Sequence, residues 1–220
     1  MKQLDILEKL VDEFKKDETI LGVLLMGSVA DGSASDMSDL DILILCDKDK
    51  FEAEFIDDVL VECLYMKYET ALYKLNNKVL EVYHYINSKI IYGDKHLREL
   101  MAIAEGQYNS YKATIEEKKE IRHWLLNTRI KLQSAINRDE SVVMNYITST
   151  NSWKLIEAIW IVNNKPIPPS SSVIKFLLEL KIVPEEKWFE TLFSGSDLEK
   201  AQRMMFCINW VLPILTVSDH

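Results

Sequence analysis

The sequence lacks the features that define several large classes of protein. It holds only three cysteines in 220 residues, and no two of them have the Cys-x-x-Cys spacing of a zinc or redox site. Cys46, Cys63 and Cys207 lie in apolar surroundings, which predicts reduced thiols and a cytoplasmic protein without disulfides. Met1 and Lys2 lead directly into a charged amphipathic segment, so we expect no signal peptide. No apolar run has the length of a membrane span, so we expect no membrane partner.

Basic residues are scarce relative to acidic ones. The chain has 26 Lys and Arg against 35 Asp and Glu, a net charge of −9, and the two signs are interspersed. Proteins that follow a phosphate backbone carry a basic stripe. We therefore expect no nucleic-acid partner. The acidic excess suits a cationic small molecule, although it is also an ordinary source of solubility.

The most informative stretch runs from Val23 to Cys46. The apolar run from Val23 to Met26 has the length of a strand and is bounded by Gly22 and Gly27, which predicts a buried strand. Gly27 and Ser28 follow at once and predict a tight turn. A glycine lets the backbone approach a ligand closely, and the neighbouring N–H groups and the Ser28 hydroxyl can face an anion.

A second strand carries two aspartates at its start. Residues two apart in a strand share a face, so Asp39 and Asp41 project side by side while Leu40 and Ile42 point into the opposite layer. Two neighbouring carboxylates repel each other unless a cation lies between them. Closely spaced oxygen ligands favour a hard divalent ion, usually Mg²⁺ held jointly with phosphates. The simpler alternative is a hairpin in which Asp39 and Asp41 cap a turn.

The order Gly27-Ser28, a polar loop, and then Ser38-Asp39-Leu40-Asp41-Ile42 resembles the signature of the DNA polymerase beta-like nucleotidyltransferase superfamily. The resemblance implies a third carboxylate on the strand that follows the aspartates. Glu62 fits best, because it lies amid apolar residues on the predicted strand Val59–Tyr65, where a buried carboxylate needs a partner. Glu81, on the predicted strand 79–85, competes with it. A third possibility is that Glu62 is an edge-strand acid in solvent.

The rest of the chain divides at about residue 105. We predict an α/β (α+β) domain with a mixed sheet over residues 1–105 and an all-α helical bundle over residues 106–220. The boundaries of the expected elements come from hydrophobic periodicity, capping boxes and breakers. In the first domain these are a helix at 2–16, a short helix or loop at 51–58, a helix at 68–76, and strands at 79–85 and 89–92. In the second they are a helix that starts at Thr114 and has Trp124 on its packed face, a helix at 142–162, a linker at 163–170, a third helix from Ser170 to Leu180, and a last helix after Ser196.

This layout resembles the aminoglycoside and lincosamide nucleotidyltransferases, in which the helical bundle completes the substrate cleft. The resemblance implies Mg²⁺-dependent transfer of a nucleoside monophosphate, AMP from ATP, to a hydroxyl of such a small molecule, with release of pyrophosphate. Asp39, Asp41 and Glu62 would be the catalytic residues and the ligands of two Mg²⁺ ions. Gly27, Ser28, Ser38 and Lys154 would bind the nucleotide.

Three points stay open at this stage. Lys154 has an equal alternative as a surface lysine beside a core tryptophan, Trp153. The protein is either a monomer or a homodimer. The alternative function is adenylylation of a protein partner, as in antitoxin-type members of the superfamily, although the long helical half of this chain argues against it. For His84 and His96 we expect structural or surface roles.

Overall fold

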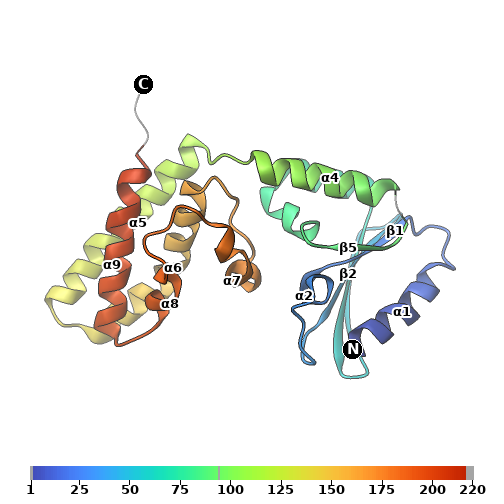
Figure 1. Cartoon of the computed structure of the whole chain (residues 1–220), viewed down its shortest axis with the longest axis horizontal. Helices are drawn as coiled ribbons and strands as arrows, with labels where there is room; N and C mark the ends of the chain where they lie inside the picture. The colour runs from blue at the N-terminus through green and yellow to red at the C-terminus, as the bar shows by residue number, and fades with distance from the viewer. Residues whose placement is uncertain (1, 94, 217–220) are drawn as a thin grey trace. The chain divides into compact units, whose positions relative to one another are not determined.

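The computed structural model describes residues 2–93 and 95–216, and the chain divides between Ser110 and Tyr111 into two compact units (Figure 1). The expected boundary after residue 105 lies inside helix α4 (Lys95–Ser110), which continues to Ser110. Each unit has its own layer structure and is described in turn.

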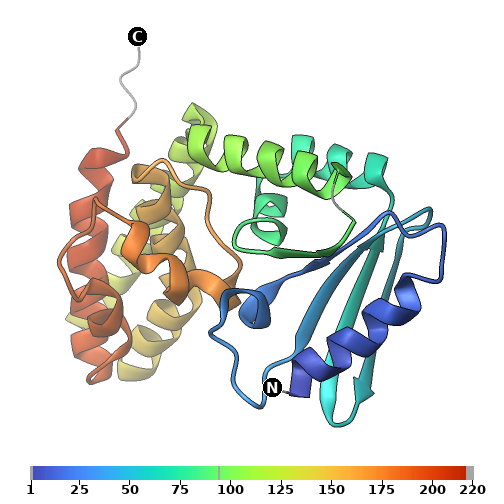
Figure 2. The same ribbon diagram turned by 45° about the vertical axis from the view of Figure 1, so that its right-hand side comes forward.

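The first unit contains a five-stranded mixed sheet with the strand order β3-β4-β2-β1-β5 (Figure 2). Strands β2 and β4 are parallel, and the other neighbours are antiparallel. The mixed sheet predicted from the sequence is therefore confirmed. The strands are β1 (Gly22–Leu25), β2 (Leu40–Leu45), β3 (Lys50–Ile56), β4 (Val59–Met66) and β5 (Lys89–Tyr92).

The segment 51–58, predicted as a short helix or loop, is instead strand β3 and the turn after it. Asp57 and Asp58 both have left-handed backbone conformations, with φ of 49° and 64°. Two consecutive residues with positive φ make a tight hairpin turn whose twist matches that of the flanking strands, and aspartate tolerates this conformation. The turn folds β3 back as an antiparallel partner of β4.

Helices cover both faces of the sheet. Helix α1 (Lys2–Phe14), predicted at 2–16, packs Ile6 and Val11 against a cluster that includes Leu40 and Ile42 of β2. The other face packs Leu43 against α3 (Tyr68–Asn77), the 3₁₀ helix η1 (Val79–His84) and α4. The alternation along β2 assigns Asp41 to this second face, together with Leu43.

The predicted strand at 79–85 is wrong, because residues 79–84 form η1 and Tyr85 directly follows it. Val82 and Tyr85 are buried in the same cluster as Leu43. β-branched and aromatic residues favour a strand locally, but here they pack as a short helix above the sheet. The strand predicted at 89–92 is confirmed as β5, although its side chains are less buried than those of β1.

The second unit contains helices and no strand among its described residues. Its three long helices, α5 (Ile115–Asn137), α6 (Ser141–Val162) and α9 (Asp197–Ile214), all pack on one another. Capping boxes at Thr114 and Ser196 begin α5 and α9, as predicted. The helix expected from Ser170 to Leu180 is broken into shorter pieces. These are η2 (Ser170–Ser172), α7 (Val173–Phe176) and η3 (Leu177–Glu179), and α8 (Trp188–Phe193) follows them.

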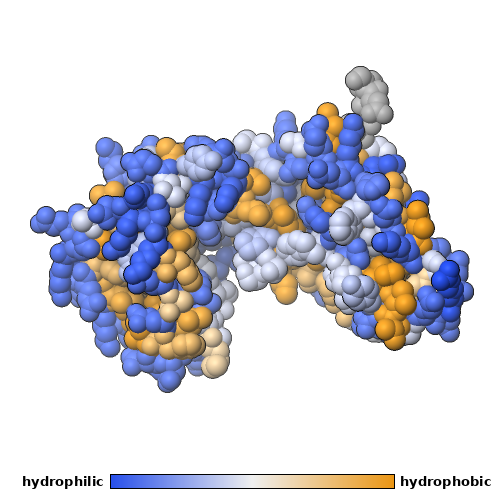
Figure 3. Space-filling model, turned by 180° about the vertical axis from the view of Figure 1, so that it is seen from behind, coloured by the Kyte–Doolittle hydropathy of each residue, from blue (hydrophilic) through white to orange (hydrophobic). Residues whose placement is uncertain are grey.

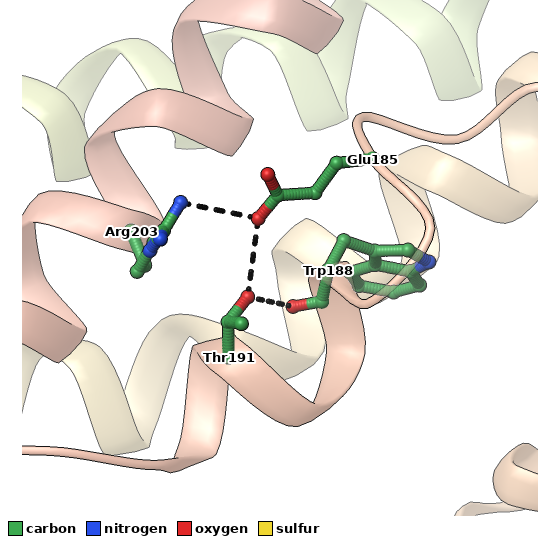
Figure 4. A network of polar contacts seen from close by, with 4 residues as sticks. All are labelled: Glu185, Trp188, Thr191 and Arg203. Carbon is green, nitrogen blue, oxygen red and sulfur yellow. Dashed lines mark hydrogen bonds and ion pairs between the residues drawn. The ribbon is translucent and has the colours of Figure 1, made fainter.

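A polar network connects the segment around α8 with helix α9 (Figure 4). Arg203 of α9 donates to Glu185 Oε1 at 3.2 Å, and Thr191 Oγ1 lies 3.3 Å from the same oxygen. Thr191 Oγ1 also lies 3.1 Å from the carbonyl oxygen of Trp188. Because the Arg203 guanidinium is charged, its bond to Glu185 is stronger than a neutral hydrogen bond of the same length.

Two details complete the comparison with the sequence. Trp124, expected on the packed face of α5, is 49% exposed, and its indole Nε1 donates to Asn151 Oδ1 of α6 at 2.8 Å. The three cysteines are free and buried. Within the described ranges, no helix combines the length and the apolarity that crossing a bilayer requires.

Candidate active site

Three carboxylates meet on the second face of the sheet. Asp39 immediately precedes β2, Asp41 is its second residue, and Glu62 lies in β4. One carboxylate oxygen from each residue lies within 4.8 Å of the others. Asp41 and Glu62 are direct neighbours in the register of the parallel pair.

The alternation of the two strands brings these side chains together. Leu40 and Ile42 are fully buried on the α1 side, so Asp41 projects to the other side. Glu62 lies between Val61 and Cys63, which belong to the α1 cluster. The Asp-x-Asp pair and Glu62 were all predicted as site residues, and the structure places them in one cluster.

The cluster is electrostatically unfavourable without a cation. Burial, together with the charges of Asp39 and Glu62, raises the pKa of Asp41 to about 6, while His84 acts in the opposite direction. Desolvation and like charges both disfavour the ionised carboxylate. A divalent ion would relieve both effects, and an all-oxygen donor set is the kind that Mg²⁺ prefers. The residues present therefore fit a divalent metal.

Gly27 lies directly against this cluster. Its φ is +65°, and a Cβ atom built on it would lie 2.1 Å from Asp41 Oδ2. The neighbouring Met26 N–H donates to the Asp41 carbonyl oxygen at 2.9 Å. The backbone at Gly27 can come this close to the Asp41 carboxylate only because glycine has no side chain.

The predicted tight turn at Gly27-Ser28 is a short helix instead. Helix α2 (Gly27–Asp31) begins directly after β1, and Gly32 ends it in a left-handed conformation with φ of 86°. Ser28 is half-buried in its first turn, and its carbonyl oxygen accepts the N–H groups of Gly32 and Ala34, both at 3.1 Å. The first N–H groups of a helix have no intrahelical acceptor, so they remain available for an anion.

Ser38 and Gln3 hold the loop that leads into Asp39. Gln3 is completely buried, and its Nε2 donates to the carbonyl oxygens of Ser35 and Ser38, both at 3.0 Å. Ser38 Oγ accepts the Ser35 N–H at 2.9 Å. Ser38, predicted to bind the nucleotide, is thus part of the loop's own hydrogen bonding. Gln3 was missed, although a polar residue on the buried side of an amphipathic helix was a signal for it.

Glu81, the other candidate for the third carboxylate, has a different partner. It lies in η1, and its Oε2 is 3.2 Å from His84 Nδ1. The close contact with the His84 imidazole lowers the pKa of Glu81. Because the His84 charge also acts on Asp41, this histidine lies close enough to influence the cluster. A structural or surface role was expected for it, so its closeness to the cluster is a second feature that the sequence did not reveal.

Lys154 lies in α6 of the second unit. Its Nζ is 2.6 Å from Glu157 Oε2 and 5.9 Å from the centre of the Trp124 ring. The aromatic neighbour in this contact is Trp124, whereas the sequence suggested Trp153. A contact between Lys154 and a nucleotide stays a prediction.

Comparison with known proteins identifies a nucleotidyltransferase domain in the first unit. Residues 8–97 match the family model described as polymerase beta, nucleotidyltransferase. The matched range includes Gly27, Ser28 and the three carboxylates. A search of the curated proteins found no match. Among solved structures, the chain is similar to a nucleotidyltransferase-like protein from Exiguobacterium sibiricum 255-15, with 14% identity and a TM-score of 0.46 over 94% of this chain and 72% of that one.

Proposed function

We propose that this protein, a nucleotidyltransferase by its polymerase beta-type domain at residues 8–97, transfers a nucleoside monophosphate to a hydroxyl of a small molecule. The donor is a nucleoside triphosphate, with ATP as the first candidate, and the acceptor is of the aminoglycoside or lincosamide kind. Pyrophosphate is the second product. The observation that carries the proposal is the cluster of Asp39, Asp41 and Glu62 beside a glycine that has no room for a side chain.

Each residue has a role that follows from its position. The N–H groups of Gly27 and Ser28 and the Ser28 hydroxyl bind the β- and γ-phosphates. Asp39, Asp41 and Glu62 would hold Mg²⁺. When bound, two Mg²⁺ ions would neutralise the charge that develops on the pyrophosphate and lower the pKa of the attacking hydroxyl. Glu62 would also accept the proton of that hydroxyl. Positioning and charge stabilisation supply most of the rate in phosphoryl transfer.

The decisive experiment measures pyrophosphate release with Mg²⁺ and each of the four nucleoside triphosphates. Pooled aminoglycosides, pooled lincosamides and a reaction without acceptor are compared. Release that depends on one pool supports the proposal and identifies the acceptor class. The double variant Asp39→Asn/Asp41→Asn should lose this activity by at least about two orders of magnitude. Asp58→Asn, at an exposed carboxylate in the β3–β4 turn, is the matched control and should keep it.

Two other results have distinct meanings. Tight triphosphate binding by calorimetry without release in any pool would direct attention to another metabolite or to a protein acceptor, whose adenylylation is the alternative function. Absence of triphosphate binding, or undiminished turnover in the double variant, would contradict the assignment of the site.

A further inference from the structure

Strand β3 has an unusual distribution of side chains for an edge strand. Its residues alternate between charged and apolar, as expected of a strand with one solvated face. However, Glu52 and Glu54 are paired with Cys63 and Val61, which belong to the α1 side of the sheet. Phe51, Ala53 and Phe55 therefore lie on the carboxylate side, whereas Ile56 packs against the α1 cluster.

The apolar side chains on the carboxylate side are left uncovered. Phe51 is 58% exposed and Phe55 is 74% exposed. Hydrophobic residues reach the molecular surface in several places among hydrophilic ones (Figure 3), but single exposed apolar residues need no explanation. Phe51 and Phe55 differ because they share one face of one strand with Ala53 between them. We call Phe51, Ala53 and Phe55 the β3 apolar face.

The register connects this face to the candidate active site. Ala53 is directly opposite Glu62, and Glu62 is directly opposite Asp41, so the three residues form one row across β3, β4 and β2. Phe51 and Phe55 lie two residues to either side of Ala53, about 13 Å apart at 3.3 Å per residue. The small Ala53 thus leaves a gap between two aromatic side chains at the edge of the carboxylate cluster.

The geometry of the reaction indicates from which end of this row the acceptor approaches the nucleotide. In-line displacement places the attacking oxygen opposite the leaving pyrophosphate. Gly27 and Ser28, the proposed phosphate contacts, follow β1, which lies on one side of β2, whereas β4 and β3 lie on the other side. A hydroxyl that attacks from the side opposite Gly27 therefore enters above Glu62, and the rest of its molecule extends over Ala53.

We infer that the β3 apolar face is the acceptor subsite and that the acceptor carries an apolar, uncharged surface next to its reactive hydroxyl. This inference rests on the proposed function. The acceptor oxygen forms a bond to the α-phosphorus, the bond from that phosphorus to the pyrophosphate oxygen breaks with its electron pair on pyrophosphate, and the hydroxyl proton passes to Glu62 and from there to water. Because the glutamates of β3 point to the other face, β3 contributes no carboxylate beside Ala53. Within the proposed function, a polycationic aminoglycoside therefore fits this face less well than an acceptor without that charge.

A second copy of the chain is a less favourable occupant. An antiparallel β3–β3 pairing that sets Phe51 against Phe55 of the other copy also sets Glu52 against Glu54. Like charges directly opposite each other in a sheet are destabilising. The charge pattern of the strand therefore argues against that pairing.

The inference is tested by equilibrium dialysis of the whole chain with 2-naphthalenemethanol, a neutral aromatic alcohol, in the presence of Mg²⁺ and a non-hydrolysable ATP analogue. We expect the wild type to bind this probe and Phe51→Thr/Phe55→Thr to bind it at least tenfold more weakly. Ala53→Phe, which fills the gap, should have the same effect. Threonine keeps the strand propensity. Glu54→Gln, on the other face of the same strand, is the matched control and should bind like the wild type.

Every other outcome overturns the inference. These outcomes are equal binding by the wild type and the double variant, no binding by the wild type, and a dimer that the double variant converts to a monomer in gel filtration. Calorimetry of the ATP analogue separates this failure from failure of the proposed function. If the analogue binds and the probe result is negative, only the subsite is wrong. If the analogue does not bind, the proposed function itself fails.

Discussion

A Cβ atom at position 27 would lie 2.1 Å from Asp41 Oδ2, so any side chain at position 27 would force the Asp41 carboxylate to move. The Met26 N–H donates to the Asp41 carbonyl oxygen at 2.9 Å in the same place. The end of β1 and the start of β2 therefore determine each other's positions. A change on either strand should affect the whole cluster.

Gly27→Ala should be severely damaging. The φ of +65° disfavours any L side chain, and the new methyl group would displace the Asp41 carboxylate. We expect a loss of about 1–3 kcal/mol in the free energy of unfolding and at least about a hundredfold loss in pyrophosphate release. Urea unfolding and the release assay measure the two effects.

Gly106→Ala is the matched control for that substitution. Gly106 lies in α4, and a Cβ atom there would meet nothing within 4 Å. Alanine in a helix interior should stabilise the protein by about 0.5–1 kcal/mol and leave activity unchanged. A Gly27→Ala protein as stable and active as Gly106→Ala would contradict the close approach.

Asp41→Asn should stabilise the metal-free protein while it removes activity. The folded protein raises the pKa of Asp41 from 3.8 to about 6. A raised pKa favours the protonated folded state, so stability is greatest below the unfolded pKa and is lost as the pH rises through about 6. Discounted for partial solvent screening, the penalty at pH 7 is about 1–2 kcal/mol. Urea unfolding in EDTA at pH 4.5 and pH 7 should show a clearly larger advantage of the variant at pH 7, because only part of the penalty is present at pH 4.5. An equal difference at both pH values would contradict this explanation.

The sequence was sufficient where one strong pattern acted alone. Alternation along β2 predicts that Asp39 and Asp41 share a face, and the structure has them on one side with Glu62. The capping boxes at Thr114 and Ser196 are equally local, and both are present. These patterns depend on neighbours within a few residues, which the sequence displays directly.

The sequence was insufficient where the partner is distant. Strand β3 was missed because glutamates are poor strand formers and its apolar side faces no core. Helix η1 was missed because Val82 packs in a cluster with Leu43 of β2, and the local sequence does not display that contact. Gln3 bonds to residues more than thirty positions away, and no local pattern gives such a partner. Whether Ser38 and Lys154 contact a nucleotide stays a prediction.

Gln3→Leu should reduce activity more than stability. The substitution removes both hydrogen bonds from Nε2 to the loop before Asp39, but it also removes the buried Oε1, which has no partner among the described residues. These effects on stability partly cancel, so we expect a change within about 1.5 kcal/mol. The loop carbonyls are left unpaired, Asp39 loses its support, and pyrophosphate release should fall by about tenfold.

Lys9→Leu is the control for Gln3→Leu, because Lys9 is an exposed residue of the same helix. It should leave both the rate and its Mg²⁺ dependence unchanged. For Gln3→Leu, the Mg²⁺ concentration that gives half-maximal rate should rise. An unchanged Mg²⁺ titration would show that the loop positions Asp39 without help from Gln3.

The capping box at the start of α5 gives a prediction for the second unit. Thr114 Oγ1 accepts the Glu117 N–H at 3.1 Å, and the Glu117 carboxylate accepts the Thr114 N–H at 2.7 Å. Thr114→Ala should lower the free energy of unfolding by about 1 kcal/mol, since the first turn loses an acceptor. Ser172→Ala is the control, because Ser172 precedes α7 without a side-chain capping bond. Urea unfolding followed by circular dichroism should separate the two variants, and equal stability would mean that tertiary packing holds the end of α5 without the cap.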